Sequence, residues 1–221
     1  MTAPAERPLL GILCRIGSSA CFAVMAAMAK LGSTHGLGLV ELVFFRSIIA
    51  TFVILACLAA AGRLDLLRTE RPLLHLRRST IGGVALIFNF AGFIFLPLSQ
   101  SVAIGFAMPL FATMMSALWL GEPVGRHRWG AVALGFVGVL LLVRPDHAGW
   151  LGMLTLLPLI GAALTALVVV TIRQMAGTEH GLTIAFYFSL FSTLGSALAL
   201  PFASLSWPTG LWWVLTALGV S

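Results

Sequence analysis

The chain has 221 residues, of which 60% are hydrophobic and only 9% are charged, and its mean hydropathy is +1.06. Ordinary soluble domains carry about 25% charged residues, so this composition excludes a soluble globular protein and predicts an integral membrane protein. A net charge of +6 would suggest nucleic-acid binding in a soluble chain, but most Lys and Arg residues here lie between apolar runs, so no nucleic-acid partner is expected.

Seven apolar runs are predicted to form membrane-spanning helices, because lipid leaves open sheet edges unsatisfied and no run alternates with the period of a barrel strand. The predicted spans are residues 9–31, 39–61, 80–96, 100–120, 129–143, 150–172 and 182–203. An eighth run begins at Gly210 and continues to Ser221. The expected fold class is therefore an all-α bundle in the lipid bilayer.

The distribution of cations predicts the orientation of the chain. With the N-terminus in the cytoplasm, ten cations fall on or near inner segments and two on outer ones, and positive residues are retained inside. The inner set is Arg7, Arg15, Arg63, Arg68, Arg71, Arg77, Arg78, Arg126, Arg128 and Arg173, and the outer set is Lys30 and Arg144.

Three pairs of short matches suggest an internal repeat, although each could arise by chance. Gly11 pairs with Gly152, His35-Gly36-Leu37 with His180-Gly181-Leu182, and Pro72 with Pro208. These offsets predict two five-helix units, residues 1–145 and 146–221, and an odd helix number inverts the second unit in the membrane. The second unit would lack roughly 60 residues, so the sequence is expected to be a C-terminally truncated product or fragment.

Four ordered segments carry a family resemblance. They are Glu41-Leu-Val-Phe-Phe-Arg46, Phe95-Leu-Pro-Leu-Ser-Gln100, Leu120-Gly-Glu122 and Gly138-Val-Leu-Leu-Leu-Val-Arg-Pro145. In this order they resemble the EamA-type branch of the drug/metabolite transporter superfamily. The resemblance implies ten helices in two inverted repeats that move small metabolites across the bacterial inner membrane. Within the branch, the sequence is most similar to members described as carriers of S-adenosylmethionine and related metabolites.

Two cations and one tyrosine are candidate substrate-binding residues. Arg46, inside the second span, could attract a substrate carboxylate or phosphate, or could snorkel or pair with Glu41. Lys30, at the end of the first span, could bind substrate or snorkel to headgroups. Tyr187 is the single tyrosine, and its hydroxyl could bond a ligand or another helix.

The third span offers a polar and aromatic stripe. Asn89 and Phe93 follow helical spacing, so an amide and a stacking ring could face a planar substrate. The alternative, slightly favoured, is an interhelical hydrogen bond with core packing.

Three further features concern gating and structure. Pro109 removes a backbone hydrogen bond within the fourth span and could kink it, either as a gating joint or without function. Glu122 is expected to pair with Arg126 and Arg128 near an interface. The small residues Ala131 and Gly135 favour close helix packing, within the fold or in a homodimer.

The function classes can be weighed from absences in the sequence. No Asp or Glu lies deep in a predicted span, which weakens a proton-driven pump for cationic drugs and favours a neutral, zwitterionic or anionic metabolite. No enzyme motif occurs, and the cysteines lack metal-ligand spacing, so no enzymatic activity, cofactor or metal is expected. The alternative to transport is an inactive truncated remnant or a non-transporting membrane scaffold.

Overall fold

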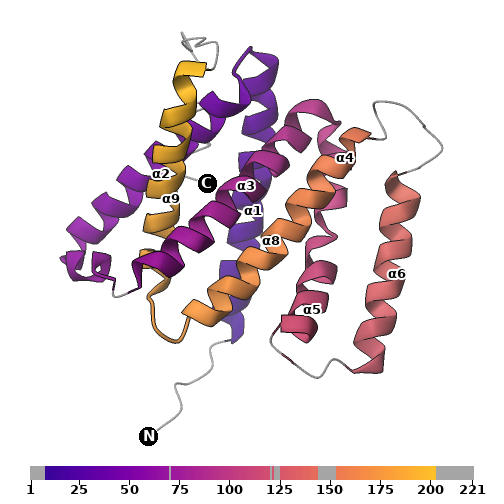
Figure 1. Ribbon diagram of the computed structural model, residues 1–221. Coiled ribbons are helices and arrows are strands. Elements are labelled where there is room, and N and C mark those ends of the chain that lie inside the picture. The colour runs from indigo at the N-terminus through magenta and orange to yellow at the C-terminus, as the bar shows by residue number, and fades with distance from the viewer. Residues whose placement is uncertain (1–7, 70, 120, 122–124, 144–152, 203–221) are drawn as a thin grey trace, which may run out of the picture.

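A computed structural model describes residues 8–69, 71–119, 121, 125–143 and 153–202, which fold into helices joined by turns (Figure 1). The elements are α1 (Pro8–Thr34), α2 (Leu39–Ala60), η1 (Leu64–Leu67), α3 (Pro72–Phe95), α4 (Leu98–Gly105), α5 (Met108–Trp119), α6 (Arg126–Val143), α8 (Leu156–Met175), α9 (Gly181–Ala199) and η2 (Leu200–Phe202). No strand occurs in these ranges, so the all-α prediction is confirmed there. The run predicted from Gly210 lies outside the described residues.

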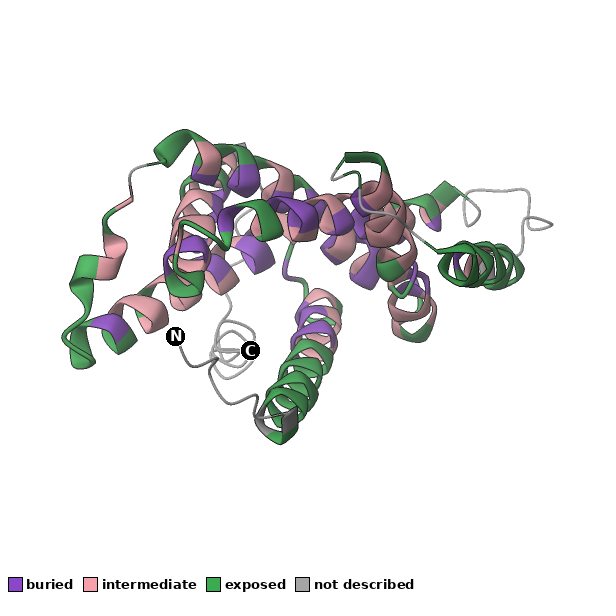
Figure 2. Cartoon of the chain, turned by 90° about the horizontal axis from the view of Figure 1, so that it is seen from below, coloured by how far each residue is buried: buried purple, intermediate pink, exposed green. Residues whose placement is uncertain are grey.

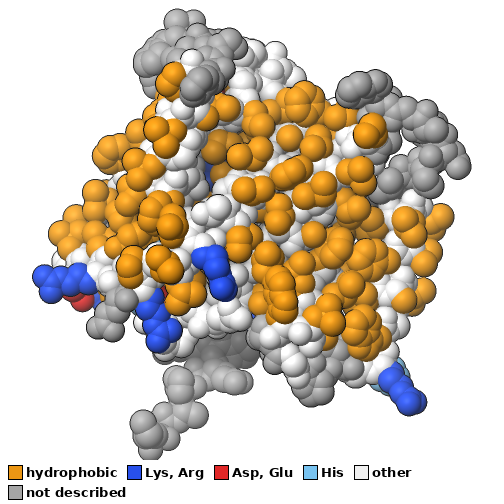
Figure 3. Space-filling view, in the orientation of Figure 1, with side chains coloured by type: hydrophobic (Ala, Val, Ile, Leu, Met, Phe, Trp, Pro, Cys, Tyr) orange, Lys and Arg blue, Asp and Glu red, His pale blue; other side chains and the backbone are white. Residues whose placement is uncertain are grey.

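Six helical segments in the described part of the chain are long and apolar enough to cross a membrane. They are Gly11–Thr34, Leu39–Ala60, Pro72–Phe95, Leu98–Trp119, Leu156–Met175 and Gly181–Ala199. The predicted span at 129–143 forms α6, which is not among these six. Figure 3 shows hydrophobic side chains over most of one face, with basic side chains toward its lower part.

Glycines end the first two helices in the same way. After α1, Gly36 has φ 90° and Leu37 N–H donates to the Gly32 carbonyl at 3.1 Å. After α2, Gly62 has φ 64° and Arg63 N–H donates to the Leu58 carbonyl at 2.9 Å. This left-handed glycine turn satisfies the last carbonyls of a helix, which is why both helices stop where the chain turns back.

Two helices differ from the sequence prediction. The helix α3 begins at Pro72 rather than at Thr80, because Pro72 occupies the first helical turn and the arginines that interrupt the apolar run are good helix formers. The span predicted at 100–120 is divided into α4 and α5. Pro109 lacks the N–H that would donate to the Gly105 carbonyl, and the chain turns at Phe106 and Ala107 instead. The role of Pro109 as a gating joint stays a prediction.

The helix α3 lies at the centre of the structure, with α8 along one side and α2 and α9 on the other (Figure 1). Small residues bring these helices together. A Cβ atom added at Gly82 would lie 2.9 Å from the Phe188 ring, and one at Gly161 would lie 2.9 Å from the Asn89 amide. The backbones of α3, α8 and α9 therefore approach more closely than larger side chains would permit.

A hydrophobic core joins α1, α2 and α3. Its members include Met25, Leu42, Phe90 and Phe93, all with less than a tenth of their surface exposed. The first half of α1 and most of α6 are exposed instead, as Figure 2 shows in green, whereas buried residues concentrate where α3, α8 and α9 meet. Exposed apolar helix faces of this kind are what a chain in lipid presents to the bilayer.

Candidate functional site

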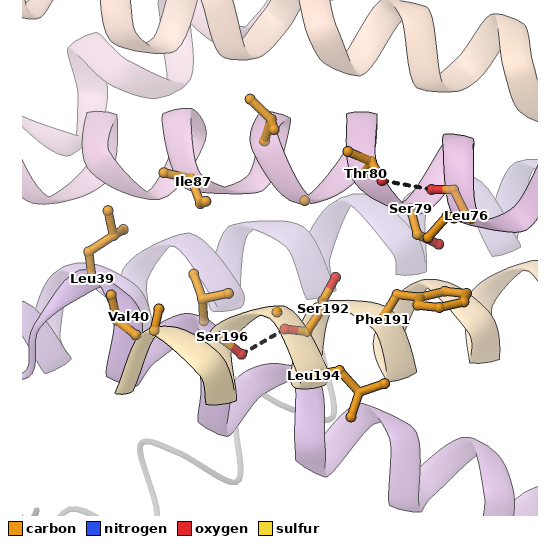
Figure 4. A pocket seen from close by; sticks show the side chains of 15 residues that line it. Leu39, Val40, Leu76, Ser79, Thr80, Ile87, Phe191, Ser192, Leu194 and Ser196 are labelled. Carbon is orange, nitrogen blue, oxygen red and sulfur yellow. Dashed lines mark hydrogen bonds between the residues drawn. The ribbon is translucent and has the colours of Figure 1, made fainter. Parts of the chain in front are cut away.

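A cavity with a volume of about 480 Å³ lies between α2, α3 and α9 (Figure 4). The N-terminal turn of α2 contributes Leu39 and Val40, and the middle of α3 contributes Ile87. Leu194, from α9, closes another side. The walls are mainly apolar, as in most small-molecule sites, and could contact the carbon skeleton of an organic metabolite.

Four hydroxyl groups interrupt the apolar wall, and two of them have no hydrogen-bond partner. Thr80 donates to the Leu76 carbonyl at 2.9 Å, and Ser196 donates to the Ser192 carbonyl at 2.7 Å. The hydroxyl oxygens of Ser79 and Ser192 are buried and unpartnered. A buried polar group without a partner costs about 1–3 kcal/mol, so both hydroxyls would gain from a polar ligand in the cavity.

Two glycines also line this cavity. No atom lies within 4 Å of the Cβ position of Gly83 in α3 or of Gly195 in α9. Both helices therefore expose bare backbone to the space between them. By contrast Gly82, the neighbour of Gly83, faces the Phe188 ring at 2.9 Å and serves helix packing.

A group of polar contacts lies next to Leu76 in the chain, toward the N-terminal end of α3, and Leu76 and Ser79 both line the cavity. Its centre is His75 of α3, which is fully buried and whose Nε2 lies 3.4 Å from the Glu179 carboxylate in the turn between α8 and α9. The Thr69 hydroxyl donates to the other Glu179 oxygen at 2.7 Å. We call the contacts among Thr69, His75, Glu179, Thr183 and Tyr187 the polar junction.

The helix α9 completes the polar junction by binding the turn η1. The Thr183 hydroxyl donates to the Leu66 carbonyl at 2.6 Å, and the Tyr187 hydroxyl donates to the Leu67 carbonyl at 2.9 Å. The Tyr187 ring also lies 4.6 Å from the His75 ring, centre to centre. Side chains of residues 146–221 thus hold backbone and side chains of residues 1–145 at this end.

Arg78, one turn along α3 from His75, is a buried cation at this end. Only 8% of its surface is exposed, and its guanidinium carbon lies 4.3 Å from the centre of the Phe188 ring. Its Nε and Nη1 atoms have no hydrogen-bond partner. The aromatic face supplies part of the stabilisation that hydrogen bonds would otherwise give.

Arg46, the leading candidate from the sequence, lies on α2 close to α1. Its Nε donates to the Met25 sulfur at 3.4 Å, and its Nη1 is buried without a partner. The nearby Glu41 carboxylate accepts from the Gly38 N–H at 2.9 Å and so caps the start of α2. Arg46 does not line the cavity between α2, α3 and α9.

The other sequence candidates contact the protein itself. Lys30 donates to the Ile94 and Leu96 carbonyls at 2.9 and 3.0 Å and caps α3 before Pro97. The Asn89 amide donates to the Ala85 carbonyl at 2.8 Å and to the Thr165 hydroxyl of α8 at 3.2 Å, which is the interhelical bond weighed above.

Phe93 and Tyr187 lie apart from each other, and Glu122 is not described. Phe93 is 3% exposed within the core, against Phe22 and Phe90. Tyr187 belongs to the polar junction. Glu122 lies outside the described residues, and its expected ion pair stays a prediction. The structure does not bring these candidates together in one cavity.

Sequence reasoning missed the cavity hydroxyls and His75. A signal for the hydroxyls exists, because Ser189, Ser192 and Ser196 recur at helical spacing in an otherwise apolar run and are all buried. His75 lies among arginines that we interpreted as a loop retained on one side of the membrane. Its burial depends on Glu179, more than 100 residues away in sequence, which no local pattern indicates.

Comparisons with known proteins place the chain among transporters. The model of the EamA-like transporter family matches residues 9–144. The pseudopaline exporter of Pseudomonas aeruginosa is 32% identical over 95% of this chain and 73% of its own length. The riboflavin transporter of Vibrio cholerae is 30% identical over 97% of this chain and 73% of its own. The S-adenosylmethionine uptake transporter of Rickettsia conorii is 26% identical over 76% of this chain and 56% of its own length.

One solved structure shares the fold. A protein crystal structure with 24% sequence identity superposes with a TM-score of 0.67, covering 93% of this chain and 73% of that chain.

Proposed function

We propose that this chain, which belongs to the EamA-like transporter family, moves a small organic metabolite across the bacterial inner membrane by alternating access. Membership confirms the resemblance seen in the sequence. The relatives are named for pseudopaline, riboflavin and S-adenosylmethionine, and they include both an exporter and uptake transporters. We therefore propose an amino-acid-like or nucleoside-like substrate, neutral, zwitterionic or anionic, and leave the direction of transport open.

The observation that carries this proposal is the cavity between α2, α3 and α9. It is lined by helices from both proposed repeats, residues 1–145 and 146–221, as a site between inverted repeats would be. Its unpartnered Ser79 and Ser192 hydroxyls are free to bind a polar group of the substrate.

The polar junction supports alternating access. Its contacts join the two proposed repeats at the end of the cavity that the cation distribution assigns to the cytoplasm. A typical hydrogen bond contributes about 1 kcal/mol net, and two conformations of a protein typically differ by a few kcal/mol in free energy. A few hydrogen bonds are therefore enough to favour one conformation over the other. We propose that the described conformation is closed at this end and that the polar junction breaks when the cavity opens there.

We retain Arg46 as the residue that attracts a negatively charged substrate group. Its buried Nη1 has no partner, whereas Lys30, Asn89, Phe93 and Tyr187 are engaged by other parts of the protein. Those four are proposed to position helices rather than to contact the substrate.

The test is exchange of labelled riboflavin, S-adenosylmethionine and an amino-acid panel in proteoliposomes. The 221-residue chain is compared with a version extended by the two further helices that the repeat predicts, taken from the Vibrio cholerae riboflavin transporter. Exchange by either version supports transport. Absence of exchange by both, with each folded and inserted, would favour the remnant or scaffold alternative.

Point variants of the active version locate the site. Ser79→Ala with Ser192→Ala should raise the substrate KM by about tenfold, because roughly 1.4 kcal/mol of hydrogen bonding is lost. Ser19→Ala is the matched control, since the Ser19 hydroxyl is exposed and bonds its own helix at Arg15. Arg46→Ala with unchanged transport of an anionic substrate would show that Arg46 does not bind it.

A further inference from the structure

A second, separate groove lies on the other side of α3, between α3, α5 and α8. Its volume is about 310 Å³. Ile81, Leu167 and Val170 form its apolar floor, and Arg77, Trp119 and Gln174 lie around it. None of these six residues lines the cavity between α2, α3 and α9, so the groove is distinct from the proposed transport site.

Three residues that line the groove lie near one end of their helices. Arg77 is in the second turn of α3, Trp119 is the last residue of α5, and Gln174 is the next-to-last residue of α8. The helices α3 and α8, and the segment Leu98–Trp119 that ends with α5, are long and apolar enough to cross a membrane, so these ends lie near a bilayer surface. Tryptophan is typical of the membrane interface, where its ring meets both apolar and polar surroundings.

The Arg77 guanidinium is available to a ligand. Both Arg77 and Gln174 are exposed, and the Arg77 Nη2 donates to the Gln174 side-chain oxygen at 3.5 Å, the outer limit for a hydrogen bond. A guanidinium has five N–H donors, so most of them remain for another acceptor. Arg173, next to Gln174, donates to the Ser116 hydroxyl at 3.1 Å and adds positive charge at the same end.

A cation at the interface above an apolar groove matches one class of ligand. We propose that the groove binds an anionic phospholipid, with its phosphate at Arg77 and Gln174 and an acyl chain along Ile81, Leu167 and Val170. Arginine forms two parallel hydrogen bonds to a phosphate, and basic pockets between membrane helices bind the headgroups of such lipids. Free phosphate would leave the apolar floor uncovered, and a zwitterionic lipid would not complement the charge.

The test measures lipid retention by the purified full chain. The chain is delipidated in detergent and titrated with phosphatidylglycerol or with phosphatidylcholine of the same acyl chains, and bound lipid is counted by native mass spectrometry. We expect phosphatidylglycerol to bind at least about tenfold more tightly than phosphatidylcholine. Arg77→Gln should remove this preference. Arg128, an exposed arginine on α6, does not line the groove, so Arg128→Gln should leave the preference intact.

A second variant and three outcomes test whether the groove binds an anionic lipid. If Arg77→Gln does not fold, Gln174→Glu tests the same site, because it places a negative charge at an exposed position and should weaken phosphatidylglycerol binding to a similar degree. Equal binding of the two lipids would overturn the proposal. So would equal losses in Arg77→Gln and Arg128→Gln, or protection against phosphatidylglycerol binding by inorganic phosphate alone at millimolar concentration. These outcomes do not depend on whether the chain transports a metabolite.

Discussion

The adjacent glycines Gly82 and Gly83 allow the transport cavity to be tested by one substitution made at two positions. A Cβ at Gly83 enters the open cavity, whereas a Cβ at Gly82 meets Phe188 at 2.9 Å. We predict that Gly83→Leu folds normally and blocks transport, and that Gly82→Leu fails to pack. The two variants have the same composition, so any difference between them depends only on which way the side chain points.

The magnitudes follow from volume and packing. The four carbons of a leucine side chain, each about the roughly 30 Å³ of a water molecule, would fill about 120 Å³, or a quarter of the 480 Å³ cavity. Adding Gly195→Leu, which also faces open space, would fill about half of the same 480 Å³. Leucine is the better helix former, so Gly83→Leu should not lower the free energy of unfolding, whereas overpacking at Gly82 costs about 1–3 kcal/mol.

Two measurements separate the effects. Thermal unfolding of the purified variants reports stability, and exchange of the transported metabolite in proteoliposomes reports the cavity. We expect Gly83→Leu to lower exchange at least about tenfold, and Gly83→Leu with Gly195→Leu to abolish it, both with an unfolding temperature at or above that of the parent chain. Gly130→Leu on α6, where the Cβ position is also open, is the control for adding a leucine.

Normal exchange by the Gly83→Leu, Gly195→Leu double variant would refute the assignment of the substrate to this cavity. Equal destabilisation by Gly82→Leu and Gly83→Leu would refute the packing argument itself, because it would mean that the two positions are not distinguished by the space around them.

Three further predictions concern residues that the sequence suggested. Lys30→Met should lower the free energy of unfolding by about 2–3 kcal/mol, measured by denaturant titration, because two charge-assisted hydrogen bonds at the end of α3 are lost. Tyr187→Phe should cost about 1 kcal/mol and, by weakening the polar junction, should increase labelling of a cysteine placed at Ser79 by an inner-side thiol reagent. Pro109→Ala should stabilise the span by up to about 3 kcal/mol and slow exchange, because α4 and α5 could then join.

Each has a control. Lys30→Arg keeps the charge and should restore part of the stability; a Lys30→Met variant that is stable but inactive would indicate a substrate role instead. Labelling of the cysteine at position 79 in the Tyr187→Phe variant is compared with its labelling in Phe186→Leu, a variant of the same helix. Both are made in a chain whose three exposed cysteines are replaced by serine. Unchanged exchange in a stabilised Pro109→Ala variant would show that the break is not a gating joint.

Within the described residues, each apolar run predicted from the sequence is helical, because burial of backbone polar groups in lipid permits few other structures. The sequence prediction placed the start of α3 too late for a specific reason. The arginines at 71, 77 and 78 ended the apolar run, but a helix can carry charged residues on its exposed turns, and Arg77 is exposed while Arg78 is covered by Phe188. Hydropathy measures the composition of a segment and not which face each side chain occupies.

The candidate site was predictable only in part. Arg46 was predicted because a charge inside an apolar run is conspicuous, and its substrate role stays a prediction; in the structure its Nη1 is buried without a partner. The polar junction was not found, because Glu179 and Tyr187 meet their partners more than 100 positions away in the chain. The two histidines whose match suggested a repeat have different structural positions. His35 lies in the turn after α1, whereas His180 caps the start of α9.

Three cations within the predicted or observed spans, Lys30, Arg46 and Arg78, differ in a way that residue type alone does not reveal. Lys30 finds two carbonyl acceptors, as expected of a cation that stabilises a fold. Arg46 and Arg78 keep buried guanidinium nitrogens without acceptors, and a desolvated charge costs several kcal/mol unless something repays it. A protein can tolerate this destabilisation when a ligand supplies the missing acceptor, because the hydrogen bonds formed with the ligand then contribute to the binding free energy.

We infer that Arg46, near the α1–α2 core, and Arg78, beside the polar junction, are the positions where a substrate anion would be stabilised along its path. Replacing each by methionine separates the two roles: a variant that is at least as stable but no longer transports supports ligand binding, and one that unfolds supports a structural role.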